Sequence, residues 1–268
     1  MSRARAAAGP ASQRRRDVGF ALTSCAVLAA YNNVAGMLPW HRRRYTLLNV
    51  CVTGAALAAA AASGLTPADL GLGREELRPG LRLGSAAAAA TAGGWVLIAA
   101  APATRPVLRD DRIAGLSQRE VAYQALVRIP LGTVLWEETA FRGVLQAALG
   151  RVMPGGAAIA VTSCIFGIWH IGSTAAALRI NGLAGGPGKT VAGVTAGVAA
   201  TAAGGVLLSW LRTHSGSLAA PMLLHAATNS MGALMAWAIT RRPAGGRERG
   251  PHEYGRWPLG GAGRPWCD

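Results

Sequence analysis

Long apolar stretches separated by short charged segments make up most of this chain. A helix needs about 20 mostly apolar residues to cross the hydrocarbon core of a bilayer. The stretches of that kind are residues 18–38, 45–65, 83–103, 121–148, 157–178, 189–211 and 216–240. Because lipid cannot satisfy the open edge of a sheet, helices are the expected spanning elements. The pattern therefore predicts an all-α, polytopic transmembrane helical bundle of about seven spans, with eight as the alternative count.

The polar segments set the expected domain limits. Residues 1–17 are basic and are expected to be disordered, and residues 241–268 form a tail rich in Gly, Pro and Arg that is also expected to be disordered. Residues 18–240 are expected to form one membrane domain, interrupted by polar connectors at 66–82 and 104–120. The arginines before the first span resemble a twin-arginine signal. No small-residue cleavage site follows, so the first span is expected to be retained.

Composition changes this picture little. The chain has 268 residues, is 51% hydrophobic and carries a formal net charge of +15. A basic balance can indicate nucleic-acid binding, but here the basic residues gather in short segments between apolar runs, as in a polytopic membrane protein. The expected partners are therefore the lipid bilayer and a membrane-associated protein or peptide, and no nucleic acid. The four cysteines form no CxxC or zinc-ligand spacing and are expected to be reduced packing residues.

A few polar and ionisable residues fall inside the expected spans, where they are costly and usually functional. They are Arg128, Glu137, Glu138 and Arg142 in the fourth span, His170 in the fifth, and His225 and Asn229 in the seventh. Three helices thus bring polar groups to the bundle interior, while Arg128 is expected to line an entrance or to snorkel. The remaining histidines are expected at the surface, in connectors or in the tail: His41, His214 and His252.

Helical spacing organises the polar set. Glu138 and Arg142 are four residues apart, so they share a face and are expected to form an ion pair, which lowers the cost of both charges. Glu137 is rotated by about 100° from Glu138 and is free to point into a cavity. His225 and Asn229 also share a face. An ion pair can simply lock two helices, and a lone histidine can be a packing residue. A carboxylate, two histidines and an amide on three helices exceed what packing requires.

This set of groups suits the hydrolysis of a peptide bond. Burial raises the pKa of a carboxylic acid, so a buried glutamate can act as a general base near neutral pH. A nearby histidine can help to hold and deprotonate a water, and a second histidine and an asparagine can donate hydrogen bonds to a developing oxyanion. The same groups could instead hold a zinc ion, with Glu137, His170 and His225 as ligands of a zinc-activated water.

Other classes of intramembrane protease fit the sequence poorly. An aspartyl dyad is excluded because every aspartate lies outside the expected spans: Asp17, Asp69, Asp110, Asp111 and Asp268. The metalloprotease motif HExxH and the serine-hydrolase motif GxSxG are both absent from the chain.

Three short motifs on the expected spans resemble those of a known family. EETAFR (137–142) matches EExxxR, FGIWH (166–170) matches FxxxH, and HAATN (225–229) matches HxxxN. In their order and separation they resemble the CPBP intramembrane proteases, also called the CAAX prenyl protease type II or Abi family. The resemblance covers about residues 120–240, and the connector GLGREELRPGLRLG (71–84) resembles the usual lead-in of the family.

The resemblance implies a multi-helix bundle with a cavity open to one membrane face. It implies a catalytic set of Glu137, His170, His225 and Asn229 and a supporting pair of Glu138 and Arg142. In this set Glu137 and His170 would activate the water, and His225 with Asn229 would form the oxyanion side. Both a metalloprotease and a glutamic-protease mechanism have been assigned to the family. The glutamic mechanism, without a cofactor, is favoured because Asn is a poor zinc ligand; zinc remains the alternative.

The sequence therefore predicts a multi-pass protein of the bacterial plasma membrane. Its predicted function is that of an intramembrane endopeptidase, which hydrolyses a peptide bond of a membrane-associated protein or peptide with a water activated by glutamate and histidine. The alternative is non-catalytic: a membrane immunity scaffold, or a small cation or proton transporter that uses the same polar cluster. Relatives that cleave prenylated proteins typically have eight spans, one more than the stretches identified here.

Overall fold

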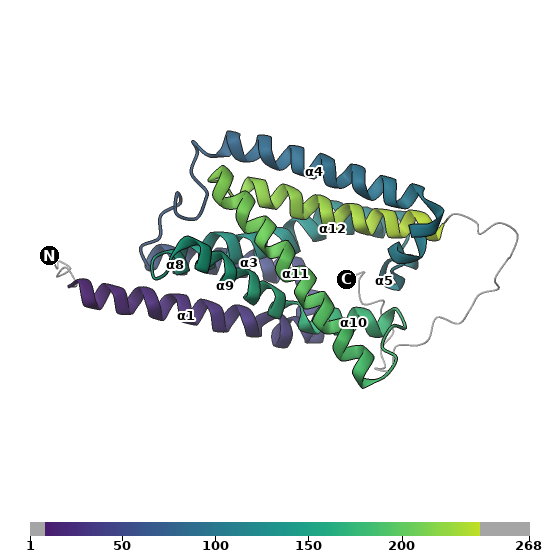
Figure 1. Cartoon of the computed structure of the whole chain (residues 1–268), viewed down its shortest axis with the longest axis horizontal. Coiled ribbons are helices and arrows are strands. Elements are labelled where there is room, and N and C mark those ends of the chain that lie inside the picture. The colour runs from purple at the N-terminus through teal and green to yellow at the C-terminus, as the bar shows by residue number, and fades with distance from the viewer. Residues whose placement is uncertain (1–8, 242–268) are drawn as a thin grey trace, which may run out of the picture.

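The computed structural model describes residues 9–241, and every regular element within them is a helix (Figure 1). The longer helices are α1 (Pro10–Val34), α3 (Tyr45–Ala62), α4 (Leu77–Ala100), α9 (Gly155–Trp169), α10 (Ile171–Ile180), α11 (Pro187–Ser215) and α12 (Ala219–Thr240). Short helices between them are η1 (Ala35–Met37), α2 (Pro39–Arg43), η2 (Pro102–Leu108) and α5 (Asp111–Ala114). The predicted all-α class is confirmed.

One continuous helical run carries the predicted fourth span. It consists of α6 (Gln118–Tyr123), η3 (Gln124–Val134), α7 (Leu135–Glu138), η4 (Thr139–Leu145) and α8 (Gln146–Gly150). The segments η3 and η4 are π-helices, which flank the two glutamates. Such π-helical turns occur frequently at functional sites. The run begins with a capping box at Ser117 and Glu120, which fixes its start close to the predicted position.

Five helical segments of the described chain are long and apolar enough to cross a membrane. They are Pro10–Met37, Tyr45–Ala62, Leu77–Ala100, Gly155–Ile180 and Pro187–Ser215. Large apolar side chains such as Leu22, Leu97 and Val191 project from them and are 64%, 72% and 65% exposed, which suits a surface that faces lipid. The protein is therefore a helical membrane bundle. The stretches predicted at 121–148 and 216–240 are not among the five, so the count of seven stays a prediction.

Two predicted boundaries need correction. Helix α1 begins at Pro10, a residue favoured at the first helical position, so the prediction of disorder for residues 1–17 is wrong for residues 10–17. Helix α4 begins at Leu77, inside the predicted polar connector 66–82. Arg78 and Arg82 lie in the first turns of α4, because the end of a spanning helix can carry charge where it lies outside the hydrocarbon core. Residues 1–8 and 242–268 lie outside the described residues, and with them most of the predicted tail.

Small residues allow the helices to approach one another closely. Helices α4 and α12 lie side by side (Figure 1), and a Cβ atom at Gly84 would lie 2.8 Å from the Cα atom of Ala220. Helices α9 and α11 pack in the same way, since a Cβ atom at Gly167 would lie 2.8 Å from the carbonyl oxygen of Val198. Such contacts are typical of bundles in lipid, where packing rather than the hydrophobic effect drives association.

The segment with the two glutamates lies in the interior of this bundle. Every residue from Trp136 to Gln146 is buried. Helices α1, α3, α9, α11 and α12 all contact the run that contains it. The charged groups of this segment therefore face protein rather than lipid, as intramembrane charges normally do.

Candidate active site

Glu138 and Arg142 form an ion pair within one helix. Arg142 Nη1 donates to Glu138 Oε1 over 3.0 Å, and neither side chain has exposed surface. Arg142 Nη2 also donates to the carbonyl oxygen of Gly205 over 3.4 Å, and the guanidinium carbon lies 4.1 Å from the centre of the Phe166 ring. The pairing predicted from the four-residue spacing is confirmed. The cation is held by a carboxylate, a carbonyl and an aromatic face.

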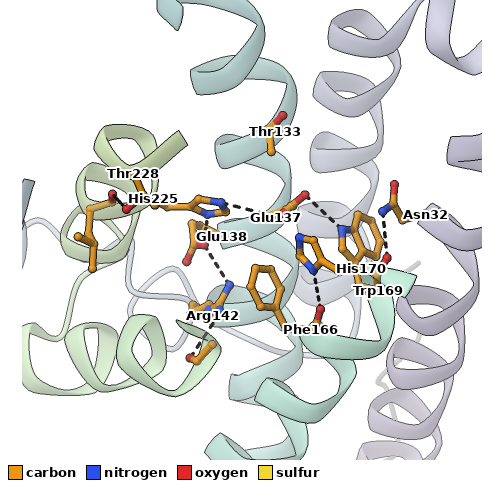
Figure 2. Close-up of polar contacts among 12 residues, drawn as sticks. Asn32, Thr133, Glu137, Glu138, Arg142, Phe166, Trp169, His170, His225 and Thr228 are labelled. Atoms are coloured by element: carbon orange, nitrogen blue, oxygen red, sulfur yellow. Dashed lines mark hydrogen bonds and ion pairs between the residues drawn. The ribbon is translucent and has the colours of Figure 1, made fainter. Parts of the chain in front are cut away.

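His225 of α12 joins this pair. Its Nδ1 atom lies 2.7 Å from Glu138 Oε1, and because a carboxylate paired with arginine can only accept, Nδ1 carries the proton. This contact directs Nε2 of His225 toward Glu137 Oε2, at 3.9 Å (Figure 2). Glu138 therefore orients His225 as well as neutralising Arg142, which the sequence did not predict.

Glu137 has its two oxygens in different surroundings. Its side chain is buried, and the indole Nε1 of Trp169 donates to Oε1 over 3.1 Å (Figure 2). Oε2 has no hydrogen-bond partner among residues 9–241. One oxygen is thus held in place while the other remains able to accept a proton. The sequence did not predict the contact with Trp169, although Trp169 stands directly before His170 in the FxxxH motif.

His170 occupies a break between two helices. Helix α9 ends at Trp169 and α10 begins at Ile171, and His170 between them has φ −91° and ψ 2°. Its Nδ1 atom lies 2.7 Å from the carbonyl oxygen of Phe166. Because a carbonyl only accepts, Nδ1 donates, and in the neutral imidazole Nε2 then carries the lone pair. His170 is therefore suited to accept a hydrogen bond or a proton from a water.

Phe166, the first residue of the FxxxH motif, packs against both histidines. Its ring centre lies 4.6 Å from the His170 ring and 6.2 Å from the His225 ring, with interplanar angles of 73° and 88°. The Phe166 ring also contacts Arg142, so it forms an apolar surface that lies against His170, His225 and Arg142 (Figure 2). Such a surface excludes water and strengthens the electrostatic interactions around it.

A cavity of about 900 Å³ opens beside these residues. His170, His225 and Asn229 lie on its wall, which also includes parts of α4, η3, α11 and the segment 108–116. The side chain of Asn229 makes no hydrogen bond within the described part of the chain, so its amide is available to a ligand. Arg128 also lines the cavity, with its guanidinium 4.1 Å above the Tyr45 ring. The volume is in the usual range for a ligand site.

One prediction about a histidine outside the motifs is wrong. His41 was expected at the surface, but it is only 2% exposed, and the hydroxyl of Tyr31 lies 2.9 Å from its Nε2. It lies in α2, where its ring contacts the rings of Tyr31 in α1 and Tyr45 in α3, so a position between two spans becomes interior. His214 is exposed as predicted, and His252 lies outside the described residues.

The predicted zinc ligands do not form a metal site in this geometry. Within residues 9–241, no three His, Cys, Asp or Glu side chains are grouped so that they could hold a metal ion. Each of the two histidines donates from Nδ1 to another group of the protein, which leaves Nε2 as its only ring nitrogen able to bind a metal. In this geometry Glu137, His170 and His225 are thus not grouped as three ligands of one zinc ion.

Comparison with known proteins identifies the central part of the chain. Residues 120–231 match the family model described as Type II CAAX prenyl endopeptidase Rce1-like. No curated protein and no solved structure gives a significant match. The matched segment contains all three motifs, and it leaves α1, α3 and α4 outside it.

Proposed function

We propose that the protein hydrolyses a peptide bond of a membrane-associated protein or peptide with a water activated by Glu137 and His170. The premise is the match of residues 120–231 to the type II CAAX prenyl endopeptidase Rce1-like family model. The observation that carries this proposal is the buried Oε2 atom of Glu137, which has no partner within residues 9–241. A base needs such a lone pair, and Trp169 holds the other oxygen of the same group. His170, which lies on the cavity wall, supplies a second acceptor through Nε2 of its neutral ring.

The proposed reaction begins with a substrate segment in the cavity. A water held by Glu137 and His170 gives up a proton to the Glu137 carboxylate as its oxygen attacks the scissile carbonyl carbon. A positioned general base of this kind contributes about 10²–10⁴-fold to the rate. The carbonyl oxygen becomes an oxyanion in the tetrahedral intermediate. The carbon–nitrogen bond then breaks, and the proton on Glu137 passes to the leaving amine.

The oxyanion is assigned to Asn229 and His225. The amide of Asn229 can donate to it directly, since it has no other partner in the described chain. His225 already donates from Nδ1 to Glu138, so donation from Nε2 requires the imidazolium form. The carboxylates of Glu138 and Glu137 lie 2.7 Å and 3.9 Å from its Nδ1 and Nε2 atoms, respectively. Loss of one oxyanion donor typically costs about 10²–10³-fold in kcat.

The experiment that tests this function compares the C-termini of proteins in membranes of two cell populations. One produces the wild type and the other the Glu137→Gln variant, at matched abundance. C-termini that appear only with the wild type would support proteolysis and identify the substrate. Identical termini, with the variant folded and present in the membrane, would favour the non-catalytic scaffold or transporter.

Removal of divalent metal ions tests the glutamic mechanism. We expect the purified protein to cleave a farnesylated peptide that ends in a CAAX sequence at a rate within about twofold of the untreated rate after dialysis against a zinc chelator, because no metal-activated water takes part. The measurement is the initial rate before and after dialysis, with a zinc-dependent protease as a positive control for chelation. A loss of activity that zinc restores would establish the metalloprotease mechanism instead.

A larger side chain in the cavity wall tests where the substrate binds. Gly204 of α11 lines the cavity, and a Cβ atom there meets no other atom within 4 Å. Gly204→Leu should therefore fold normally, yet fill part of the cavity and lower kcat/KM by about tenfold or more. Gly188 is the matched control, because it lies on the same helix in open space away from the cavity. Equal rates for Gly204→Leu and Gly188→Leu would place the substrate elsewhere.

A further inference from the structure

An asparagine of α1 takes the place of one backbone hydrogen bond in the α9–α10 helix. In an unbroken helix the amide N–H of Gly172 would donate to the carbonyl oxygen of Ile168. Here the N–H of Gly172 donates to Asn33 Oδ1 over 2.8 Å, and Asn33 Nδ2 donates to the Ile168 oxygen over 2.8 Å. The side-chain amide of Asn33 therefore bridges the two groups that the break at His170 separates.

The neighbouring asparagine completes this arrangement. Asn32 Nδ2 donates to the carbonyl oxygen of Trp169 over 3.0 Å (Figure 2). Backbone groups released by a helix break are costly at membrane depth unless protein satisfies them. Asn32 and Asn33 together satisfy three such groups. The insertion of a side chain into a helical hydrogen-bond ladder is also a recognised cause of helix kinks.

Tyr31, the residue before the two asparagines, holds the indole of Trp169. The two rings are stacked, with centres 5.7 Å apart and planes inclined by 12°. The hydroxyl of Tyr31 donates to Asn49 Oδ1 over 3.1 Å, and Asn49 Nδ2 donates to the carbonyl oxygen of Gly132 over 2.7 Å. Tyr31 is thus fixed against the helical run that carries Glu137, while its ring orients the indole that donates to Glu137.

We propose that Tyr31, Asn32 and Asn33, the α1 triplet, position the catalytic groups. Asn33 opens the α9–α10 helix at His170, and Tyr31 sets the orientation of Trp169 and through it of Glu137. The inference rests on the proposed function, because it treats His170 and Glu137 as catalytic. The triplet lies outside the matched residues 120–231, so this chain adds to its active site from a helix beyond the family segment.

The Asn33→Ala variant distinguishes a positioning role, which affects kcat, from a purely structural role, which affects stability. Without the asparagine amide, Gly172 N–H and the Ile168 oxygen can return to each other, and the helix can close across His170. We therefore expect kcat for the farnesylated CAAX peptide to fall by about 10–100-fold, as for other small displacements of catalytic groups, with KM nearly unchanged. The thermal unfolding temperature should not fall, because the lost contacts are replaced within the helix.

The NMR signal of the Gly172 amide is sensitive to the helix break at His170, and it can be measured without any substrate. Ile171–Gly172 is the only Ile–Gly step in the sequence, so labelling with carbonyl-¹³C isoleucine and ¹⁵N glycine selects one amide signal in an NMR spectrum of the full chain. This signal should move in Asn33→Ala and stay in place in Ser24→Ala. The control removes a hydroxyl that bonds to the Phe20 carbonyl within α1, away from the triplet.

Several results would overturn the inference. They are an unmoved Gly172 signal in Asn33→Ala, an unchanged kcat, or a kcat that falls only in step with the unfolding temperature. If Asn33→Ala does not fold, Asn33→Ser gives the same comparison, because serine is too short to bridge both groups; failure of both to fold would show a structural role. Glu137→Gln, measured in parallel, separates the two proposals. Full activity of Glu137→Gln contradicts the proposed function, whereas an inactive Glu137→Gln beside a fully active Asn33→Ala contradicts this inference alone.

Discussion

Replacing Glu137 by Gln is expected to lower kcat for peptide hydrolysis by about 10²–10⁴-fold while the protein stays folded. Glutamine has the shape of glutamate, and its Oε1 can still accept the hydrogen bond from the Trp169 indole. Its amide nitrogen cannot take a proton from a water in the place of Oε2. The measurement is kcat of the purified protein on the farnesylated CAAX peptide, together with the thermal unfolding temperature.

The matched control for this variant is Glu75→Gln. The substitution is chemically the same, and Glu75 is exposed. Both variants should unfold at the temperature of the wild type, and only Glu137→Gln should lose activity. If Glu137→Gln retained full activity, Glu137 would have no role in the reaction. The non-catalytic alternatives would then become the better account of the polar cluster.

Replacing Glu138 by Gln is expected to act on stability instead, and to lower the free energy of unfolding by about 3–5 kcal/mol. The substitution leaves the guanidinium of Arg142 buried without a counter-charge, since Glu138 is the carboxylate it pairs with and neither side chain has exposed surface. It also takes from His225 the charged acceptor that fixes its ring. Unfolding in mixed detergent micelles, with wild type and variant side by side, measures the difference.

A double variant separates the effect of the unpaired charge on Arg142 from the effect of losing the contact between Glu138 and His225. In Glu138→Met with Arg142→Met, both charges are gone and the volumes are similar. Replacement of a complete buried ion pair by apolar residues is often neutral or stabilising. The double variant should therefore recover most of the stability lost by Glu138→Gln, but not the activity, because His225 remains without its acceptor. Equal stability losses in Glu137→Gln and Glu138→Gln would instead show that both carboxylates are structural.

Contacts within one helix could be predicted from the sequence. The periodicity of a helix placed Glu138 beside Arg142, and the ion pair is present. The same argument placed His225 and Asn229 on one face, and both line the cavity. These predictions succeed because the relevant geometry is fixed by a spacing of four residues, which does not depend on how the helices pack.

Contacts between helices could not be predicted in this way. Glu137 with Trp169, Glu138 with His225 and Asn33 with Gly172 are far apart in the sequence. Apolar runs locate spans but do not set the rotation of each helix about its axis. A signal for the α1 triplet did exist, because Tyr31, Asn32 and Asn33 are consecutive polar residues in an otherwise apolar run. Their target, a helix break at His170, is visible only in the structure.

The number of membrane spans also could not be predicted from the sequence. Apolar character alone treated the stretch at 121–148 as one regular helix, whereas the structure divides it among α-helical and π-helical segments. The part from Trp136 to Gln146 is buried inside the bundle, whereas Leu126 and Leu131 of η3 are 74% and 47% exposed. A window of hydrophobic residues does not distinguish a helix covered by other helices from one that faces lipid.

The location of the Glu138–Arg142 pair within a single helix bears on how the protein is made. The segment 118–150 is synthesised before α12, which supplies His225. Because both partners of the ion pair come from the same segment, their charges are balanced as soon as that helix forms, and its entry into the bilayer from the translocon need not await a later helix. The residues proposed to bind the oxyanion, His225 and Asn229, are synthesised only with α12. A nascent chain that stalls before α12 would therefore be inserted without His225 and Asn229, and the proposed proteolytic activity would begin only once α12 has been synthesised.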